Sequence, residues 1–451
     1  MIQPRTLKGF RDYPPATMIP REAIIETARR VYRSYGFSPI DTPALEHLEI
    51  LTGKGSDETD KQLYRFEDNG GRAIGMRFDL TIPLARFVAQ HIGQLGTPFK
   101  RYHIANVWRG ETPQRGRFRE FMQCDFDTVG TTSPTTDIET VLVIHDLLHA
   151  IGFERFTIRV NNRKVLTGLL DQLGLRTQTV AVLRALDKLP KIGPTKVAAE
   201  MKRTANASEE QIKQVLQLAS LCGRKDQAGN GPGENVGLID QLKPLIAGSE
   251  EGEAGLTQLT QLLAGCQAAG VGAQHIQVDV SIARGLDYYT GMVVETFLDD
   301  LPEIGSVCSG GRYDNLASLY TKQQLPGVGA SLGLDRLLAA MEELNLLADT
   351  TTTAEVLLPY FVADHLNDYL KLASQLRAVG QRVEFYPEAK KLGKQLQYAN
   401  RKGFRVALVI GEDEFTACEC QIKDLSQGTS RTVSMQDGVP EIVAEINRIL
   451  G

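Results

Sequence analysis

The chain has 451 residues, of which 42% are hydrophobic and 23% are charged, and its formal net charge at pH 7 is −5. These proportions are ordinary for a globular protein and exclude a disordered or collagen-like chain. At about 150 residues per domain the length predicts two or three domains. No run of 18 apolar residues is present, and the first residues lack the apolar core of a signal peptide. We therefore expect a cytoplasmic protein with no contact to a membrane.

The first third of the chain mixes helix and strand patterns. Apolar residues at helical spacing predict a helix over 17–35, which Gly36 would end. Segments 99–108 and 119–129 have the composition of strands, and the loop between them contains glycine and proline. This pattern predicts a hairpin with a long tip.

The middle of the chain changes character. Leu, Ala, Gln and Lys dominate residues 165–275, which predicts a helical region, and strand and turn patterns return over 276–336. A polar run near residue 350 favours a linker over 346–353. The expected domains are then 1–345, with 165–275 inserted, and 354–451.

The last hundred residues alternate short apolar runs with amphipathic segments. We expect strands at 356–360, 383–385 and 406–410, and helices at 364–379, 391–402 and 440–450. Strands that alternate with helices predict a small α/β domain with a partly parallel sheet.

The segment from Trp108 to Asp127 is the strongest candidate for chemistry. If its second strand is unbroken, one face carries Arg117, Arg119, Phe121, Gln123, Asp125 and Asp127. Guanidinium groups bind phosphate bidentately, and Arg109 and Arg115 add further positive charge. From composition alone, a ligand site and a charged hairpin on a solvated face remain equal alternatives.

Four further segments have features of sites. Residues 283–291 place two tyrosines beside an arginine and an aspartate, and residues 310–314 predict a turn with a polar tail. Residues 327–336 predict a strand that leads into a helix, with glycines that permit close approach. Residues 77–83 predict a strand with Asp79 and Thr81 on one face.

Histidines and cysteines give no metal-site pattern. His145 and His149 stand one helical turn apart, but no glutamate follows the first, so we interpret them as part of a helix surface. The other histidines, including His275, show no ligand spacing, and the six cysteines contain no Cys-x-x-Cys pair. We expect no structural metal site held by the protein.

Taken in order, these segments resemble the histidyl-tRNA synthetase family of class II aminoacyl-tRNA synthetases. Residues 36–43, 108–127 and 329–336 are similar to motifs 1, 2 and 3 of the class, and 284–291 and 309–314 to the two signatures of the histidine enzymes. The resemblance implies an α/β fold. It comprises an antiparallel catalytic sheet flanked by helices, a helical insertion and a carboxy-terminal α/β anticodon-binding domain.

The resemblance also implies substrates and roles. ATP with Mg²⁺ and L-histidine would form histidyl-adenylate, which a homodimer would transfer to histidine tRNA. Arg109 and Arg284 would contact the α-phosphate from two sides and act as the catalytic residues. The other ATP residues would be Glu111, Phe121 and Arg336. The other histidine-binding residues would be Asp79, Thr81, Gln123, Asp127, Tyr288 and Tyr289. The residues for tRNA would be Gln114 and Arg115 at the acceptor end and a basic patch of Lys390, Lys391, Lys394, Arg401, Lys402 and Arg405 in the anticodon domain.

The sequence departs from the family pattern at a few positions. Thr112 stands where bacterial-type members usually carry arginine, and Asp79 and Asp127 stand where others have glutamate. One alternative is the inactive regulatory paralogue that partners ATP phosphoribosyltransferase in histidine biosynthesis, which typically lacks the carboxy-terminal domain and the arginine at 284. Another is a class II synthetase for proline or threonine, against which Asp127 and the tyrosine pair argue.

Overall fold

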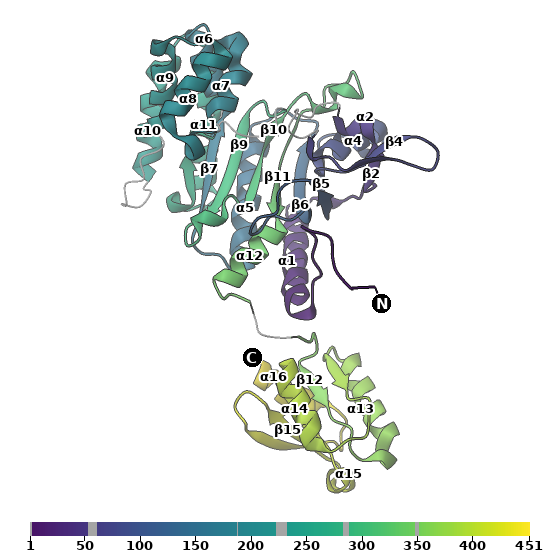
Figure 1. Cartoon of the computed structure of the whole chain (residues 1–451). Helices are drawn as coiled ribbons and strands as arrows, with labels where there is room; N and C mark the ends of the chain where they lie inside the picture. The colour runs from purple at the N-terminus through teal and green to yellow at the C-terminus, as the bar shows by residue number, and fades with distance from the viewer. Residues whose placement is uncertain (1, 53–60, 187, 222–231, 283–287, 348–350) are drawn as a thin grey trace. The chain divides into compact units, whose positions relative to one another are not determined.

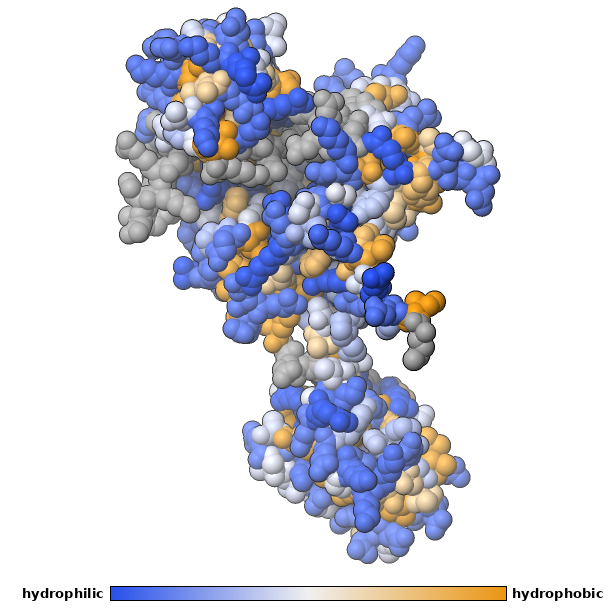
Figure 2. All heavy atoms as spheres, in the orientation of Figure 1, coloured by the Kyte–Doolittle hydropathy of each residue, from blue (hydrophilic) through white to orange (hydrophobic). Residues whose placement is uncertain are grey.

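The computed structural model describes residues 2–52, 61–186, 188–221, 232–282, 288–347 and 351–451. The chain divides into two compact units, Met1–Arg11 with Ile24–Asn345 and Asp12–Ala23 with Leu346–Gly451 (Figure 1). Hydrophilic side chains cover most of the face shown in Figure 2. Across the described ranges, every helix is too short or too polar to cross a membrane.

An eight-stranded sheet forms the centre of the first unit. In spatial order its strands are β1 (Ser38–Pro39), β5 (Phe99–Trp108), β6 (Glu120–Val129), β11 (Gly327–Gly333), β10 (Cys308–Tyr313), β9 (Met292–Leu298), β7 (Phe156–Asn162) and β8 (Ile276–Val278). Only the edge pairs β1–β5 and β7–β8 are parallel. The mostly antiparallel sheet that the resemblance implied is therefore confirmed.

The predicted hairpin is present as β5 and β6, which pair from Phe99 opposite Val129 to Trp108 opposite Glu120. Helix α1 (Pro15–Ser34) packs on this hairpin, where the Tyr32 hydroxyl donates to the Cys124 carbonyl at 2.9 Å. Gly36 follows α1 with φ +79°, a conformation that favours glycine and ends the helix as predicted. The remaining helices of the sheet are α4 (Thr81–Leu95), α5 (Thr135–Ile151) and α12 (Leu334–Glu343).

A small three-stranded sheet lies before α4 in the chain. It consists of β2 (Leu45–His47), β4 (Ala73–Met76) and β3 (Arg65–Glu67), with α2 (Leu48–Thr52) after β2.

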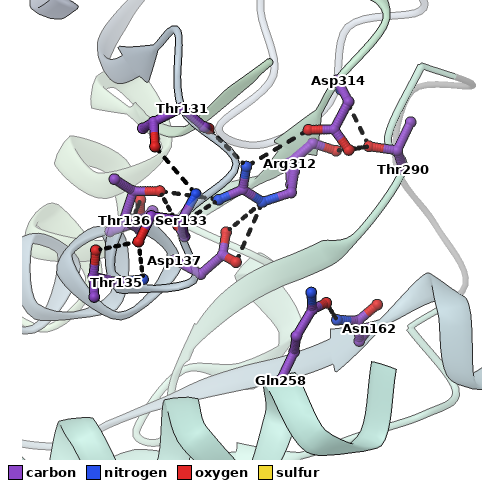
Figure 3. Close-up of polar contacts among 11 residues, drawn as sticks. Thr131, Ser133, Thr135, Thr136, Asp137, Asn162, Gln258, Thr290, Arg312 and Asp314 are labelled. Carbon is purple, nitrogen blue, oxygen red and sulfur yellow. Dashed lines mark hydrogen bonds and ion pairs between the residues drawn. The ribbon is translucent and has the colours of Figure 1, made fainter. Parts of the chain in front are cut away.

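A helical region connects the parallel neighbours β7 and β8 (Figure 1). Its helices are α6 (Arg163–Gln172), η1 (Arg176–Gln178), α7 (Thr179–Leu186), α8 (Leu189–Ala205), α9 (Glu209–Leu221), α10 (Pro232–Ile246), α11 (Glu250–Ala268) and η2 (Ala273–His275). The Asn162 amide donates to the Gln258 side chain at 2.8 Å, which joins α11 to the end of β7 (Figure 3).

The second unit contains a five-stranded sheet. In spatial order its strands are β13 (Val383–Phe385), β12 (Val356–Leu358), β14 (Val406–Val409), β15 (Glu419–Asp424) and β16 (Ser430–Ser434). Its helices are α13 (Leu366–Ala378), α14 (Leu392–Lys402), α15 (Glu412–Ala417) and α16 (Pro440–Leu450). The predicted α/β pattern is confirmed, with β12 parallel to β13 and β14, whereas the antiparallel strands β15 and β16 were not predicted.

Two sequence expectations are wrong. Residues 310–314 were expected to form a turn, but Gly310 to Tyr313 belong to β10 in the middle of the large sheet. Residues 77–83 were expected to form a strand, but Asp79 precedes α4. Its Oδ1 accepts the backbone N–H groups of Thr81 and Ile82 at 3.2 and 2.9 Å. The acid therefore satisfies backbone donors that the first turn of a helix leaves unpaired.

Glycines in β10 and β11 create space inside the sheet. A Cβ atom on Gly329 would lie 2.2 Å from the Phe126 carbonyl oxygen and 2.3 Å from Oδ1 of Asp127. A Cβ on Gly311 would lie 3.0 Å from the Tyr289 ring. Only glycine therefore lets these strands pass so close to an acid and a phenol on neighbouring elements.

We predict that Gly329→Ala lowers the free energy of unfolding by about 1–3 kcal/mol, because the new methyl group must displace backbone. The matched control is Gly333→Ala in the same strand, where φ is −80° and a Cβ would meet nothing closer than 3.7 Å. Its effect should stay within about 0.5 kcal/mol. Urea unfolding of both variants measures the difference, and equal destabilisation would contradict the argument.

Candidate active site

A cavity beside β6 and β11 collects residues from the 108–127 and 327–336 segments. Five residues to which we assigned ligand contacts line it: Arg109, Glu111, Phe121, Gln123 and Arg336. Three further lining side chains, Ser309, Ser331 and Asp335, were not predicted. The charged hairpin is therefore not a uniformly solvated face.

Arg109 is held as a fixed cation in this cavity. Its guanidinium carbon lies 4.3 Å from the centre of the Phe78 ring and 5.0 Å from that of Phe121. Its Nε donates to the Phe78 carbonyl at 3.2 Å. Burial lowers the pKa of Arg109, while Asp79 and Glu111 raise it, and the side chain stays charged because free arginine titrates above pH 12. The remaining nitrogens are positioned to bind an anion.

One end of the Gln123 amide is hydrogen-bonded, and the other has no partner among the described residues. Its Nε2 donates to the Ser331 hydroxyl at 2.8 Å, across the β6–β11 pair. Its Oε1 is buried and has no hydrogen-bond partner among the described residues. A free, buried acceptor beside a cation is suited to a ligand that carries both an ammonium group and an anion.

Asp127 belongs to a buried polar group that the sequence argument only partly identified. Its Oδ2 lies 2.6 Å from the Arg101 guanidinium, and its Oδ1 accepts the Tyr313 hydroxyl at 2.5 Å. Burial raises the pKa of Asp127, while Arg101 and Tyr313 lower it. Arg101 and Tyr313 were missed. The hairpin register, which sets Arg101 directly opposite Asp127, was the available signal for the arginine.

Tyr288 and Tyr289 lie with Tyr313 around this acid. The rings of Tyr288 and Tyr289 meet edge to face at 5.0 Å, and Tyr288 approaches Tyr313 at 6.0 Å. Burial raises the pKa of all three phenols, so they remain protonated donors at neutral pH. The Thr81 side chain hydrogen-bonds Tyr288, which connects the start of α4 to the tyrosine pair.

The other predicted residues are dispersed. Arg284 lies outside the described residues. Gln114 and Arg115 are exposed at the tip of the β5–β6 loop, beside exposed Thr112, and Arg115 forms an ion pair with Glu343 at 2.5 Å. Neither residue lines the cavity.

The six cations of the predicted basic patch in the second unit differ in their exposure and in their contacts. Lys390, Lys391, Lys394 and Arg401 are exposed around α14, whereas Lys402 is half-buried with its ammonium 5.9 Å from the Tyr398 ring. Arg405 donates to the carbonyls of Ile449 and Leu450 at 2.6 and 2.9 Å. Arg405 therefore satisfies the last carbonyls of α16, whereas Lys390, Lys391, Lys394 and Arg401 present their charges to solvent around α14.

Arg312 of the 309–314 signature does not reach the cavity but anchors β10 (Figure 3). Its Nε donates to the Asp137 carboxylate at 3.0 Å, at the start of α5. Its terminal nitrogens donate to the carbonyls of Thr131 and Ser133 at 3.2 and 3.1 Å and to the Thr136 hydroxyl at 2.9 Å. Burial raises the pKa of Asp137 to about 6, while Arg312 lowers it. This signature arginine holds the sheet and α5 together.

A mostly antiparallel sheet presents an arginine, an aromatic ring and an amide to one cavity, which agrees with the class II aminoacyl-tRNA synthetase fold that the resemblance implied. A sequence profile of histidyl-tRNA synthetases matches residues 9–337, and a profile of anticodon-binding domains matches residues 355–445. The chain belongs to the histidyl-tRNA synthetase family. It is an enzyme, a histidine–tRNA ligase with an anticodon-binding domain.

Individual relatives agree with this assignment. The histidine–tRNA ligase of Rhodopirellula baltica is 60% identical over 445 residues, 99% of this chain and 98% of that protein. The crystal structure of histidyl-tRNA synthetase from Nostoc sp. PCC 7120 superposes with a TM-score of 0.87 at 34% identity, over 99% of this chain and all of that one.

A structure described as an ATP phosphoribosyltransferase regulatory subunit/histidyl-tRNA synthetase, from Bacillus halodurans, has a TM-score of 0.72 at 23% identity. It covers 88% of this chain and 97% of that one, and at this identity it shows the fold alone. The anticodon-binding domain and the 60% identity to a histidine–tRNA ligase support the ligase rather than the regulatory alternative.

We predict that Arg312→Ala lowers the free energy of unfolding by about 3–5 kcal/mol, because it leaves the buried Asp137 carboxyl without its cation. Arg155→Ala is the control, since Arg155 is 70% exposed and its ion pair with Asp300 lies at the surface. That change should cost less than about 1 kcal/mol. Urea unfolding compares the two variants, and a small effect at Arg312 would show that the pair does not anchor β10.

Proposed function

We propose that L-histidine and ATP react in the cavity beside β6 and β11 to give histidyl-adenylate and pyrophosphate, and that the terminal ribose hydroxyl of histidine tRNA then attacks the mixed anhydride, takes the histidyl group and releases AMP. The observation that carries this proposal is the combination of a fixed cation, Arg109, and a free acceptor, Gln123 Oε1, in one cavity. An amino acid bound there would direct its carboxylate to the cation and its ammonium to the amide.

The first step joins two anions, because the histidine carboxylate attacks the α-phosphorus of ATP and pyrophosphate leaves. Fixed positive charge and alignment lower the barrier of such a reaction. Arg109 supplies one charge, and the family resemblance assigns a second to Arg284. Phe121 and Arg336 offer an aromatic face and a cation to the adenine ring. Mg²⁺ enters with ATP as part of the substrate and neutralises the phosphates that leave.

Selection of histidine is assigned to the buried polar group around Asp127. A neutral imidazole has one N–H donor and one acceptor nitrogen. Asp127 accepts the N–H, and the protonated Tyr289 donates to the other nitrogen. Sites that read hydrogen bonds in this way reject analogues that lack them by ~10⁴ or more. Asp79 and Thr81 complete the contacts to the amino end of the substrate.

The wider assignments follow the resemblance. Residues 1–345 form the catalytic domain with the insertion 165–275, residues 346–353 the linker, and residues 354–451 the anticodon-binding domain. Gln114 and Arg115 at the exposed loop tip contact the acceptor end of the tRNA. The enzyme acts as a homodimer in the cytoplasm.

Amino-acid-dependent exchange between ATP and pyrophosphate tests the cavity, with histidine, proline and threonine offered separately. We predict exchange with histidine alone. Arg109→Ala should reduce the rate by about 10²–10³, the usual loss when one group that stabilises transition-state charge is removed. Arg155→Ala should retain the rate, because Arg155 does not line the cavity. Exchange with proline or threonine, or full activity of Arg109→Ala, would contradict the proposal.

Charging of tRNA tests the surface of α14. We predict that the double variant Lys394→Ala/Arg401→Ala raises the KM for histidine tRNA and leaves the exchange reaction unchanged. Each lost phosphate contact should also reduce the slope of log affinity against log salt by about 0.7–0.9. Lys371→Ala, an exposed lysine of α13, is the control. An unchanged KM and salt slope would remove α14 from the tRNA-binding surface.

A further inference from the structure

Three histidines meet at the end of α5, and none of them lines the cavity. His145 and His149 stand one turn apart on α5, and His275 ends η2, where the chain returns from the helical insertion to β8. One ring nitrogen from each lies within 4.8 Å of the other two. The sequence interpretation of His145 and His149 as a helix surface is incomplete. Both are half-buried, and a third imidazole joins them across the fold.

The three rings have a geometry close to that of metal ligands. Their centroids are 4.5, 5.1 and 5.4 Å apart, and the ring planes are inclined by 68–85° rather than stacked. Nitrogens bound to a tetrahedral zinc ion at about 2.0–2.1 Å stand about 3.4 Å from one another. Small side-chain rotations therefore bring the three nitrogens from their present spacing to a common ion.

The Nδ1 atom of every ring already faces an acceptor. The pairs are His145 with Asp146 Oδ1 at 3.0 Å, His149 with Glu154 Oε2 at 3.5 Å, and His275 with the Phe156 carbonyl at 3.1 Å. A carboxylate or carbonyl oxygen only accepts, so at His145 and His275 these contacts favour the tautomer that carries the proton on Nδ1 and leaves the lone pair on Nε2. Histidines that bind metals are typically oriented by such a partner on their other nitrogen.

The surroundings hold this arrangement in place. The buried Phe156 ring stacks on His275 at 4.5 Å and meets His149 edge to face at 5.1 Å. Asp146 is held in turn by the Tyr35 hydroxyl at 2.5 Å. His149 remains 30% exposed, so one side of the cluster is open to solvent. The cluster thus has three oriented nitrogens, an apolar wall and an entry path.

The cluster is separate from the catalytic cavity. Asp137, which binds Arg312, lies in the first turn of α5, and His145 and His149 follow eight and twelve residues later. At 1.5 Å per residue the histidines lie about 12–18 Å further along the helix. No histidine of the cluster lines the cavity.

We propose that His145, His149 and His275 bind a divalent transition-metal ion of the zinc type, with the fourth position open to water. Imidazole nitrogens favour zinc and its neighbours, whereas magnesium and calcium prefer oxygen ligands, so this site is distinct from the Mg²⁺ that enters with ATP. The ion joins the end of α5 to the segment that closes the helical insertion. Its role is structural.

The test uses the full-length enzyme without a polyhistidine tag, stripped by a chelator and then supplied with Zn²⁺ or Co²⁺ alone. We expect one ion per chain to remain after gel filtration. We also expect a Tm several degrees above that of the stripped protein and, for Co²⁺, the visible absorption of a four-coordinate ion. A ligand that binds only the folded state raises Tm in this way.

Two single variants test whether the metal ion binds to this histidine cluster. His149→Ala removes a half-exposed ligand with little threat to the fold and should abolish retention of the ion and the shift in Tm. His47→Ala removes an exposed histidine of β2 and should change neither. Circular dichroism of the stripped variants checks that both are folded. No retained metal in the wild type, or equal retention in wild type and His149→Ala, would overturn the proposal, as would loss in His47→Ala.

Discussion

The ion pair between Arg101 and Asp127 is the interaction on which the site depends. Both side chains are almost completely buried, and the shortest distance between them is 2.6 Å. A buried pair of charges costs desolvation energy that Coulomb attraction and further hydrogen bonds must offset, and loss of one partner leaves the other isolated. The Tyr313 hydroxyl supplies such a bond to Asp127. The register of the β5–β6 hairpin therefore orients Asp127, the acid to which we assign recognition of the substrate's imidazole ring.

Space around that acid comes from neighbouring strands rather than from a loop. Gly329 of β11 passes against Asp127, and Gly311 of β10 passes against Tyr289. Arg312, the residue after Gly311, binds Asp137 at the start of α5 and so fixes the position of β10 in the sheet. Rigid strands, secured by packing and hydrogen bonds, keep a binding site in its productive geometry. The signature around 309–314 is therefore explained by architecture as much as by ligand contact.

Much of the fold and of the candidate site could be predicted from the sequence, and each successful or failed prediction has a physical reason. Helical spacing and Gly36 defined α1, and the family resemblance led to Arg109, Phe121, Gln123 and Arg336, which share the cavity. Residues 310–314 were expected to form a turn, and strand β10 was missed there, because glycines weaken any strand pattern and are required only by contacts across the sheet. β16 contains a single buried side chain, Val433, so its apolar pattern is too weak to detect. His275 gave no signal because its partners are distant in sequence, and only the fold brings them together.

The buried acceptor of Gln123 bears on substrate selection. An acceptor that is buried without a partner costs about 1–3 kcal/mol, and Oε1 of Gln123 has none among the described residues. Arg109, by contrast, is held by the Phe78 carbonyl and two aromatic rings before any ligand arrives. An ammonium group that reaches Oε1 removes a cost already present in the free enzyme. A carboxylic acid that lacks an amino group would bind Arg109 but leave Oε1 of Gln123 without a hydrogen-bond partner. In the function proposed above, the amide would thus favour amino acids over other carboxylic acids, and the group around Asp127 would select for the side chain.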